Sequence, residues 1–206
     1  MTVNVPAILI GLILASYWGQ VMYMTRRAKR ATGRAANVVP PELLGRLLRL
    51  IWAPIIVIWI AMPFVVGFGA NSLWLLEPLA HWPIVAWICS GIVVIGYIAT
   101  RRCWKTMGKE WRMGIDPAEK TKMVASGPFA YVRHPIYALS QMMMIATAVA
   151  IPAPLMIAVA VTHILLLQWE SRREEQHMVR TQGEAYSDYC RQVGRFLPKR
   201  FGPYSG

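Results

Sequence analysis

Two stretches of the chain combine charged and aromatic side chains with the start or end of an apolar segment. The first, SGPFAYVRHPIYALSQMMM, spans residues 126–144 and places Arg133 and His134 directly before Pro135. The residue before a proline avoids the α region, and proline suits the first turn of a helix, so His134 should be extended and Pro135 should begin a helix. Free N–H groups at that helix start, with Arg133 beside them, predict an anion-binding position.

The second stretch follows an apolar segment, where residues of helical spacing continue into a polar sequence. Intervals of 7, 4, 3 and 4 residues place five polar side chains on one helix face: His163, Glu170, Glu174, His177 and Thr181. This stripe has two interpretations, a polar site that joins membrane and water, or a solvated lattice of ion pairs in which Arg173 faces Glu170 and Arg172 faces Glu175.

Aromatic residues follow in the tail, where Tyr186 and Tyr189 have helical spacing and Gly194 and Pro198 end the helix. They either pack the tail against the rest of the protein or, close to carboxylates, form a site for a flat cationic ligand.

Composition identifies the setting of these residues as a membrane. Hydrophobic residues make up 56% of the 206 residues, and the mean hydropathy is positive. About five apolar spans are expected, at residues 5–24, 50–70, 83–100, 136–151 and 154–169, so the predicted fold is an all-α integral membrane protein with a helical C-terminal tail. The last two spans are short and could form a tight hairpin.

The distribution of charge predicts how the chain crosses the membrane. All 22 Lys and Arg residues lie in three blocks, with seven in 25–49, eight in 101–135 and seven in 170–206, and the turns at 71–82 and 152–154 have none. Under the positive-inside rule the N-terminus lies outside, and the site and C-terminus lie in the cytoplasm; in a bacterium this would be the inner or plasma membrane. A net charge of +12 arranged in this way fits an anionic membrane surface and no nucleic-acid partner. The three cysteines are scattered, so neither a disulfide nor a metal site is expected.

Taken together, the ordered motifs resemble the family of isoprenylcysteine carboxyl methyltransferases and phospholipid N-methyltransferases. The motifs are MGKEWRMGID, MVASGPFAYVRHPIY, the pair Glu174 and Glu175, and QGEAYSDYCRQVGRFLP, and they occupy the C-terminal half. The resemblance implies a methyltransferase core at 101–206, whereas hydropathy alone places three transmembrane helices, with a basic cytoplasmic connector at 25–49, in residues 1–100. Leu139 and Gln182 depart from the family pattern.

The resemblance implies S-adenosylmethionine as cofactor, bound without a Rossmann domain. The residues expected to line its pocket are Gly127, Arg133, His134, Pro135, Tyr137, Glu174 and Tyr186, and the residues expected at the reaction are Glu174, Glu175 and Arg195. The helix start at Pro135, with Arg133 or His134, would hold the methionyl carboxylate. Glu174 or Glu175 would hold the ammonium or the ribose, while Tyr137 and Phe129 would flank adenine.

The acceptor is expected to be lipidic. The cofactor is water-soluble and reaches the site from the aqueous side, so the bilayer is the other route by which a molecule can enter. A carboxylate acceptor would be oriented by Arg195 or Arg173. A lipid amine would need a base, either Glu174, Glu175 or His177. Two other classes remain open, a nicotinamide-dependent membrane reductase of sterol-like lipids and a non-catalytic scaffold or carrier, and no obligate protein partner is inferred.

Overall fold

A computed structural model describes residues 3–32, 42–70, 72–108, 111 and 123–204. In this part of the chain the regular elements are helices: α1 (Val5–Thr32), α2 (Leu43–Gly67), α3 (Pro83–Met107), the short 3-10 helix η2 (Gly127–Ala130), α4 (Pro135–Ala150), α5 (Pro154–Gln182) and α6 (Glu184–Gln192). The expected all-α membrane fold is confirmed. Much of the family motif at 107–116 lies outside the described residues.

Four of the described helices, α1, α2, α3 and α5, are long and apolar enough to cross a membrane, and α4 is a shorter apolar helix of 16 residues. The helices run past the predicted spans. The helix α2 begins at Leu43 rather than at residue 50, and α3 continues past residue 100 to Met107. Charged helix ends therefore extend from the apolar bundle, and they reach the site described below.

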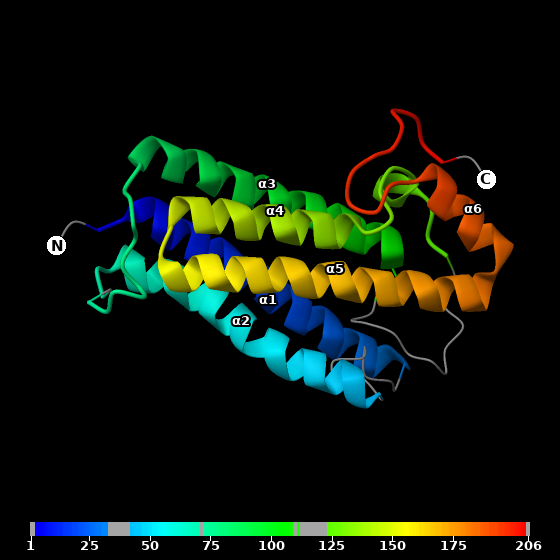
Figure 1. Ribbon diagram of the computed structural model, residues 1–206, viewed down its shortest axis with the longest axis horizontal. Helices are drawn as coiled ribbons and strands as arrows, with labels where there is room; N and C mark the ends of the chain where they lie inside the picture. Colours follow the sequence, from blue (N-terminus) through cyan, green and yellow to red (C-terminus); the bar gives the residue numbers. More distant parts are fainter. Residues whose placement is uncertain (1–2, 33–41, 71, 109–110, 112–122, 205–206) are drawn as a thin grey trace.

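The bundle is built around the α4–α5 hairpin, which lies against α3 on one side and α2 on the other (Figure 1). The helix α1 packs against α2 and α3. Small residues permit close helix contact, as at Gly96 of α3, where an added Cβ would lie 2.5 Å from Cγ of Met143 on α4. Pro154 begins α5 after the turn at Ile151–Ala153, and α5 then runs 29 residues without a break, which confirms the predicted continuation beyond the apolar stretch.

A series of hydrogen bonds between polar side chains crosses the apolar interior. Trp52 on α2 donates through Nε1 to Nδ1 of His163 at 3.2 Å, and Nε2 of His163 lies 3.0 Å from the hydroxyl of Ser140 on α4. Because Nδ1 accepts a hydrogen bond, the neutral ring carries its proton on Nε2 and donates to Ser140. His163 therefore connects three helices, and this part of the predicted stripe is a packing contact.

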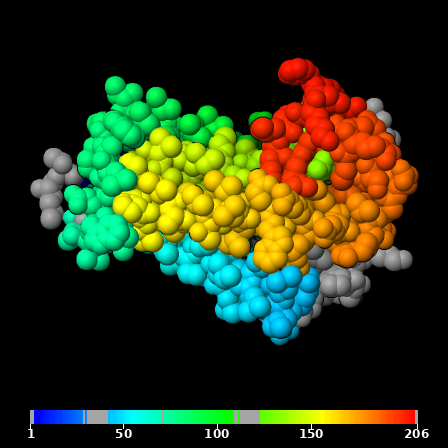
Figure 2. Space-filling model, in the orientation of Figure 1, coloured from blue at the N-terminus to red at the C-terminus, as the bar shows by residue number. Residues whose placement is uncertain are grey.

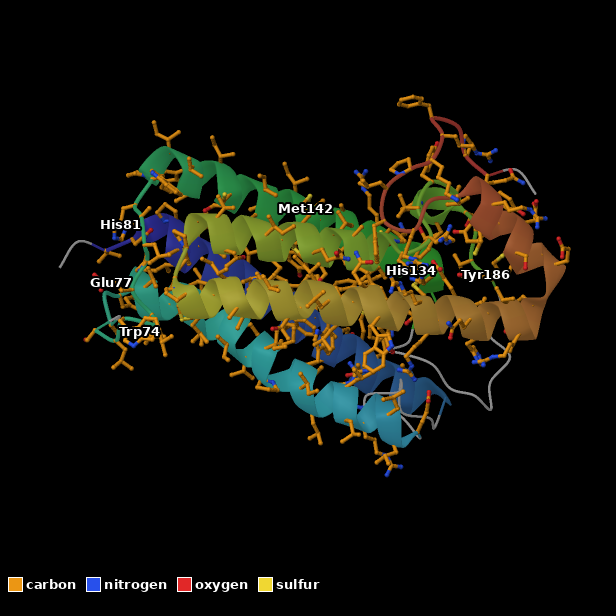
Figure 3. The ribbon with its side chains drawn as sticks, viewed as in Figure 1. Trp74, Glu77, His81, His134, Met142 and Tyr186 are labelled. Atoms are coloured by element: carbon orange, nitrogen blue, oxygen red, sulfur yellow. The ribbon has the colours of Figure 1, made fainter. Side chains whose placement is uncertain are left out.

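The segments that follow α5 gather at one end of the bundle. In the space-filling view, α6 and the segment after it cover the end at which α4 begins (Figure 2). His134 and Tyr186 lie at this end, whereas Trp74, Glu77 and His81 lie at the opposite end (Figure 3).

Candidate active site

The loop before α4 has a fixed backbone shape. Gly127 has φ +56°, a left-handed conformation that favours glycine, and an added Cβ would lie 3.2 Å from Oγ1 of Thr106. The 3-10 helix η2 starts at this glycine, and Pro135 then opens α4 with His134 as its N-cap residue. The predicted helix start is confirmed, and Gly127 shapes the loop that leads to it.

The loop is held by the tail through main-chain hydrogen bonds. The N–H of Arg133 donates to the carbonyl of Gly194 at 2.8 Å, and the N–H of His134 donates to the carbonyl of Arg195 at 3.0 Å. Val132 and Gly194 form an isolated parallel bridge. Gly194 has no room for a side chain, because an added Cβ would lie 1.8 Å from the carbonyl oxygen of Leu197.

Glu175 on α5 is the centre of a cluster of ion pairs with the loop before α4 and the tail. Its Oε1 accepts from Nε of Arg133 at 2.9 Å and from Nε of Arg195 at 2.9 Å, and its Oε2 accepts from Nη2 of Arg195 at 2.5 Å. His134 adds Nε2 at 3.3 Å from Oε1. With 8% of the residue exposed, Glu175 is enclosed by three basic side chains. The lattice expected for it, with Arg172, is therefore replaced by partners from the loop and the tail.

Arg133 is fully engaged by the protein itself. Besides Glu175, its Nη1 donates to the carbonyl of Cys190 at 3.0 Å and to the carbonyl of Val193. With only 7% of the side chain exposed, this guanidinium fixes the end of α6 to the loop. It has little remaining capacity for a cofactor carboxylate.

Glu174 has a different environment from its neighbour. The hydroxyl of Tyr137 donates to Oε1 of Glu174 at 2.5 Å, and Nδ1 of His134 lies 3.4 Å from Oε2. The side chain is 24% exposed, compared with 10% for that of Glu175. Glu174 therefore keeps lone pairs available for a ligand, with the rings of Tyr137 and His134 stacked beside it at an angle of 3°.

His134 joins the two carboxylates. Burial alone would lower the pKa of His134, but its hydrogen bonds to Glu174 and Glu175 outweigh burial, so its pKa is raised above the ordinary 6.5. The imidazolium form is thereby favoured, and the ring serves as a positive bridge between α5 and the start of α4.

A second ion cluster, of which the sequence predicted only one pair, brings α2 to the same end. Nη2 of Arg173 lies 2.9 Å from Oε1 of Glu42, and its Nη1 lies 2.7 Å from Oε2 of Glu170. Arg49, whose guanidinium lies 5.0 Å from the ring centre of Trp52, interacts electrostatically with Glu170 and Glu174. The pair of Arg173 and Glu170 was predicted from spacing, but no local signal indicated Glu42 or Arg49 as its neighbours.

The tail aromatics form a small core of their own. Tyr186 and Tyr189 are 5% and 2% exposed, and they pack with Val193. Burial raises the pKa of the Tyr186 phenol well above its ordinary value. The hydroxyl of Tyr189 donates to the carbonyl of Phe129, whose side chain is also buried. In this arrangement Tyr186 and Phe129 support the loop and the tail.

The described residues contain no group of three or more His, Cys, Asp or Glu side chains placed to hold a metal ion. The chemistry available at the site is that of a carboxylate, an imidazole and a phenol beside a helix start. These groups can bind a cation or hydroxyls and can accept a proton.

Comparison with known proteins bears on the class of protein to which the chain is similar. Residues 88–180 match the isoprenylcysteine carboxyl methyltransferase (ICMT) family. Methanethiol S-methyltransferase from Pseudomonas sp. strain GM41 is 28% identical over 210 residues, which cover 97% of this chain and 75% of that protein. The nickel-cobalt-cadmium resistance protein NccN of Alcaligenes xylosoxydans xylosoxydans is 22% identical over 114 residues, 55% of this chain and about half (53%) of that protein. No solved structure matches.

The chain is therefore an ICMT-like integral membrane methyltransferase. S-Adenosylmethionine is the usual methyl donor of such enzymes. The predicted resemblance to this family and the predicted enzyme class are confirmed.

Proposed function

We propose that this protein transfers a methyl group from S-adenosylmethionine to an apolar acceptor that reaches the site from the bilayer. The observation that carries the proposal is the contrast between adjacent glutamates. Glu175 is neutralised by Arg133, Arg195 and His134, whereas Glu174 stays partly exposed beside Tyr137. Such a carboxylate is suited to contact a cationic cofactor or a proton-bearing acceptor.

The residues present fit the cofactor. Glu174 would accept hydrogen bonds from its ammonium or ribose, and the start of α4 with His134 would face its carboxylate. Bound there, the cofactor would supply an electrophilic methyl group, and S-adenosylhomocysteine would leave when its S–CH3 bond breaks. Arg133, Glu175 and Arg195 would act as positioning residues, because their charges already compensate one another and hold the loop against the tail.

The ion pairs favour an acceptor that must lose a proton. In the described part of the chain, Arg133 and Arg195 face Glu175, Arg173 faces Glu42 and Glu170, and Arg49 interacts with Glu170 and Glu174. A carboxylate acceptor would have to displace one of these partners to gain an arginine. A lipid amine meets Glu174 as a base and needs no such exchange.

A thiol is the second candidate acceptor. The name of the Pseudomonas relative, methanethiol S-methyltransferase, supports S-methylation, and the relative matches nearly the whole of this chain. A thiol also has to be deprotonated, so Glu174 can serve it as it would serve an amine.

Transfer of labelled methyl to three acceptors tests the proposal. Membranes containing the protein would receive labelled S-adenosylmethionine with methanethiol, phosphatidylethanolamine or an isoprenylcysteine analogue. We expect label in the volatile thioether or in alkali-resistant lipid. Alkali-labile label would indicate a carboxyl ester and contradict the inference from the arginines. Membranes with Glu174→Gln provide the control, and absence of label from every acceptor would refute the proposed activity.

We further propose that the site faces the cytoplasm, as the basic blocks at 101–135 and 170–206 indicate. A cysteine introduced as Gly202→Cys, at an exposed position, should react with an impermeant maleimide only after the membrane is opened. The background variant for this experiment replaces Cys190, the partly exposed native cysteine. Labelling of intact cells would contradict this orientation.

A further inference from the structure

Two buried side-chain nitrogens without a hydrogen-bond partner belong to residues one helical turn from Tyr137 and Glu174. In the described part of the chain, four buried side-chain nitrogens have no hydrogen-bond partner: Trp18 Nε1, Gln141 Nε2, His177 Nε2 and Arg200 Nε. Gln141 is four residues after Tyr137 on α4, and His177 is three residues after Glu174 on α5. Each is thus one turn away, on the same helix face, from a residue of the Tyr137–Glu174 hydrogen bond.

The directions of the helices bring both side chains toward that hydrogen bond. Long side chains on a helix lean toward its N-terminus, so Gln141 leans toward Tyr137 and His177 leans toward Glu174. The helix α4 runs from the site into the apolar bundle, and α5 runs back out of it. Gln141 therefore approaches the site from the membrane side, and His177 approaches from the tail side.

Gln141 has no evident packing reason to be polar. The neighbouring residues of α4 are Met142, Met143 and Met144, and the next residue on its face, Ile145, is 49% exposed at the apolar surface. A buried amide N–H without a partner is destabilising, and a methionine of similar length would avoid that cost. A polar side chain kept at this depth points to a ligand that supplies the missing partner.

We propose that Gln141 recognises the methyl acceptor, its amide N–H donating to a lone pair on or next to the nucleophilic atom. This inference rests on the proposed methyl transfer and adds which residue selects the acceptor. The cofactor is water-soluble and would occupy the tail side, whereas a molecule arriving from the bilayer meets Gln141 first. The acceptor class that fits is an apolar thiol or amine, whose heteroatom lone pair is its main polar feature.

The test is the variant Gln141→Met, compared with Ile145→Ala as a matched change at the lipid-facing surface of the same helix. Methanethiol and phosphatidylethanolamine in detergent micelles are the acceptor probes, and cofactor affinity is measured by calorimetry. We expect Gln141→Met to raise the acceptor KM about tenfold, in line with loss of one hydrogen bond. Cofactor Kd should stay unchanged, and thermal stability should be equal or higher. Ile145→Ala should leave the acceptor KM unchanged.

The outcomes separate this inference from the proposed function. If the wild-type protein methylates a probe and Gln141→Met does so with the same KM, the inference is wrong while the methyltransferase function stands. A higher cofactor Kd in Gln141→Met would also overturn the inference, because it would indicate that Gln141 contacts the cofactor. A lower thermal stability with unchanged KM would show that the amide is structural. If the wild-type protein methylates no probe, the proposed function fails, and this inference fails with it.

Discussion

Arg195, in the tail, donates to both carboxylate oxygens of Glu175, 20 residues earlier in the chain. A two-point pair of this kind fixes the plane of the carboxylate as well as its position. The hydrogen bonds that Arg195 donates to Glu175 raise the pKa of Arg195 further above its ordinary value, so this charge persists at any pH of interest. The tail is thus held by an interaction that ordinary changes of pH do not remove.

The variant Glu175→Gln should lower stability strongly, because it leaves the buried guanidinium of Arg133 and the guanidinium of Arg195 without their shared carboxylate. Loss of one member of a buried ion pair costs about 3–5 kcal/mol. Thermal unfolding of the detergent-solubilised protein measures the effect. Glu174→Gln is the matched control at the adjacent position. An equal loss of stability in both variants would contradict the structural role given to Glu175 alone.

Changes at Glu174 and Tyr137 should lower activity much more than stability. Glu174→Gln and Tyr137→Phe each remove part of the hydrogen bond between the exposed carboxylate and the phenol. A hydrogen bond to a charged group contributes about 1.5–3 kcal/mol, so we expect kcat/KM to fall roughly 10- to 100-fold with a small change in melting temperature. Steady-state kinetics of methyl transfer checks this. Full activity of Glu174→Gln would show that the Glu174 carboxylate has no role in methyl transfer.

Gly194→Ala should release the tail from the loop before α4. The added methyl group meets a backbone carbonyl oxygen, that of Leu197, which has no flexible side chain to move aside. Limited proteolysis should then cut near residues 193–197, a region that the wild-type fold protects. Gly202→Ala is the control, because a Cβ there meets nothing within 4 Å. Equal protection of Gly194→Ala and the wild-type protein from proteolysis would contradict the prediction that Gly194 is needed to hold the tail against the loop before α4.

Stability should depend on pH through His134. Its pKa is raised in the folded state, so its contribution is complete below the ordinary pKa of about 6.5 and is lost as pH rises through the higher folded value. The melting temperature of the wild-type protein should therefore exceed that of His134→Asn most at about pH 6, the acid side of that range. The difference should narrow in alkaline buffer, and a difference that grows with pH would contradict the sign.

Local patterns in the sequence predicted the fold and part of the site. Pro135 indicated a helix start that the structure confirms, and apolar runs located the helices, although α2 begins earlier than expected. The periodicity after His163 predicted that α5 continues past its apolar stretch. These features depend on neighbours within a few residues, which is why spacing could reveal them.

The partners of the charged residues could not be predicted in the same way. Arg133 and Glu175 are 42 residues apart, and Arg173 and Glu42 are 131 residues apart, so only the packed helices determine these pairs. Spacing on α5 offered Arg172 to Glu175, but burial favours the loop and tail arginines. The cofactor and catalytic roles assigned from sequence, including those of Gly127, Tyr186 and Arg195, remain predictions.

The bonds of Arg133 and His134 to Gly194 and Arg195 also impose an order of assembly. The bundle helices α1 to α5 precede residue 183 in the chain, so they leave the ribosome before the tail that holds the loop before α4. Until Arg195 has emerged, Glu175 lacks one cation and the loop before α4 lacks its main-chain partners. The contacts that hold the loop before α4 therefore form only after the bundle helices α1 to α5 have been synthesised.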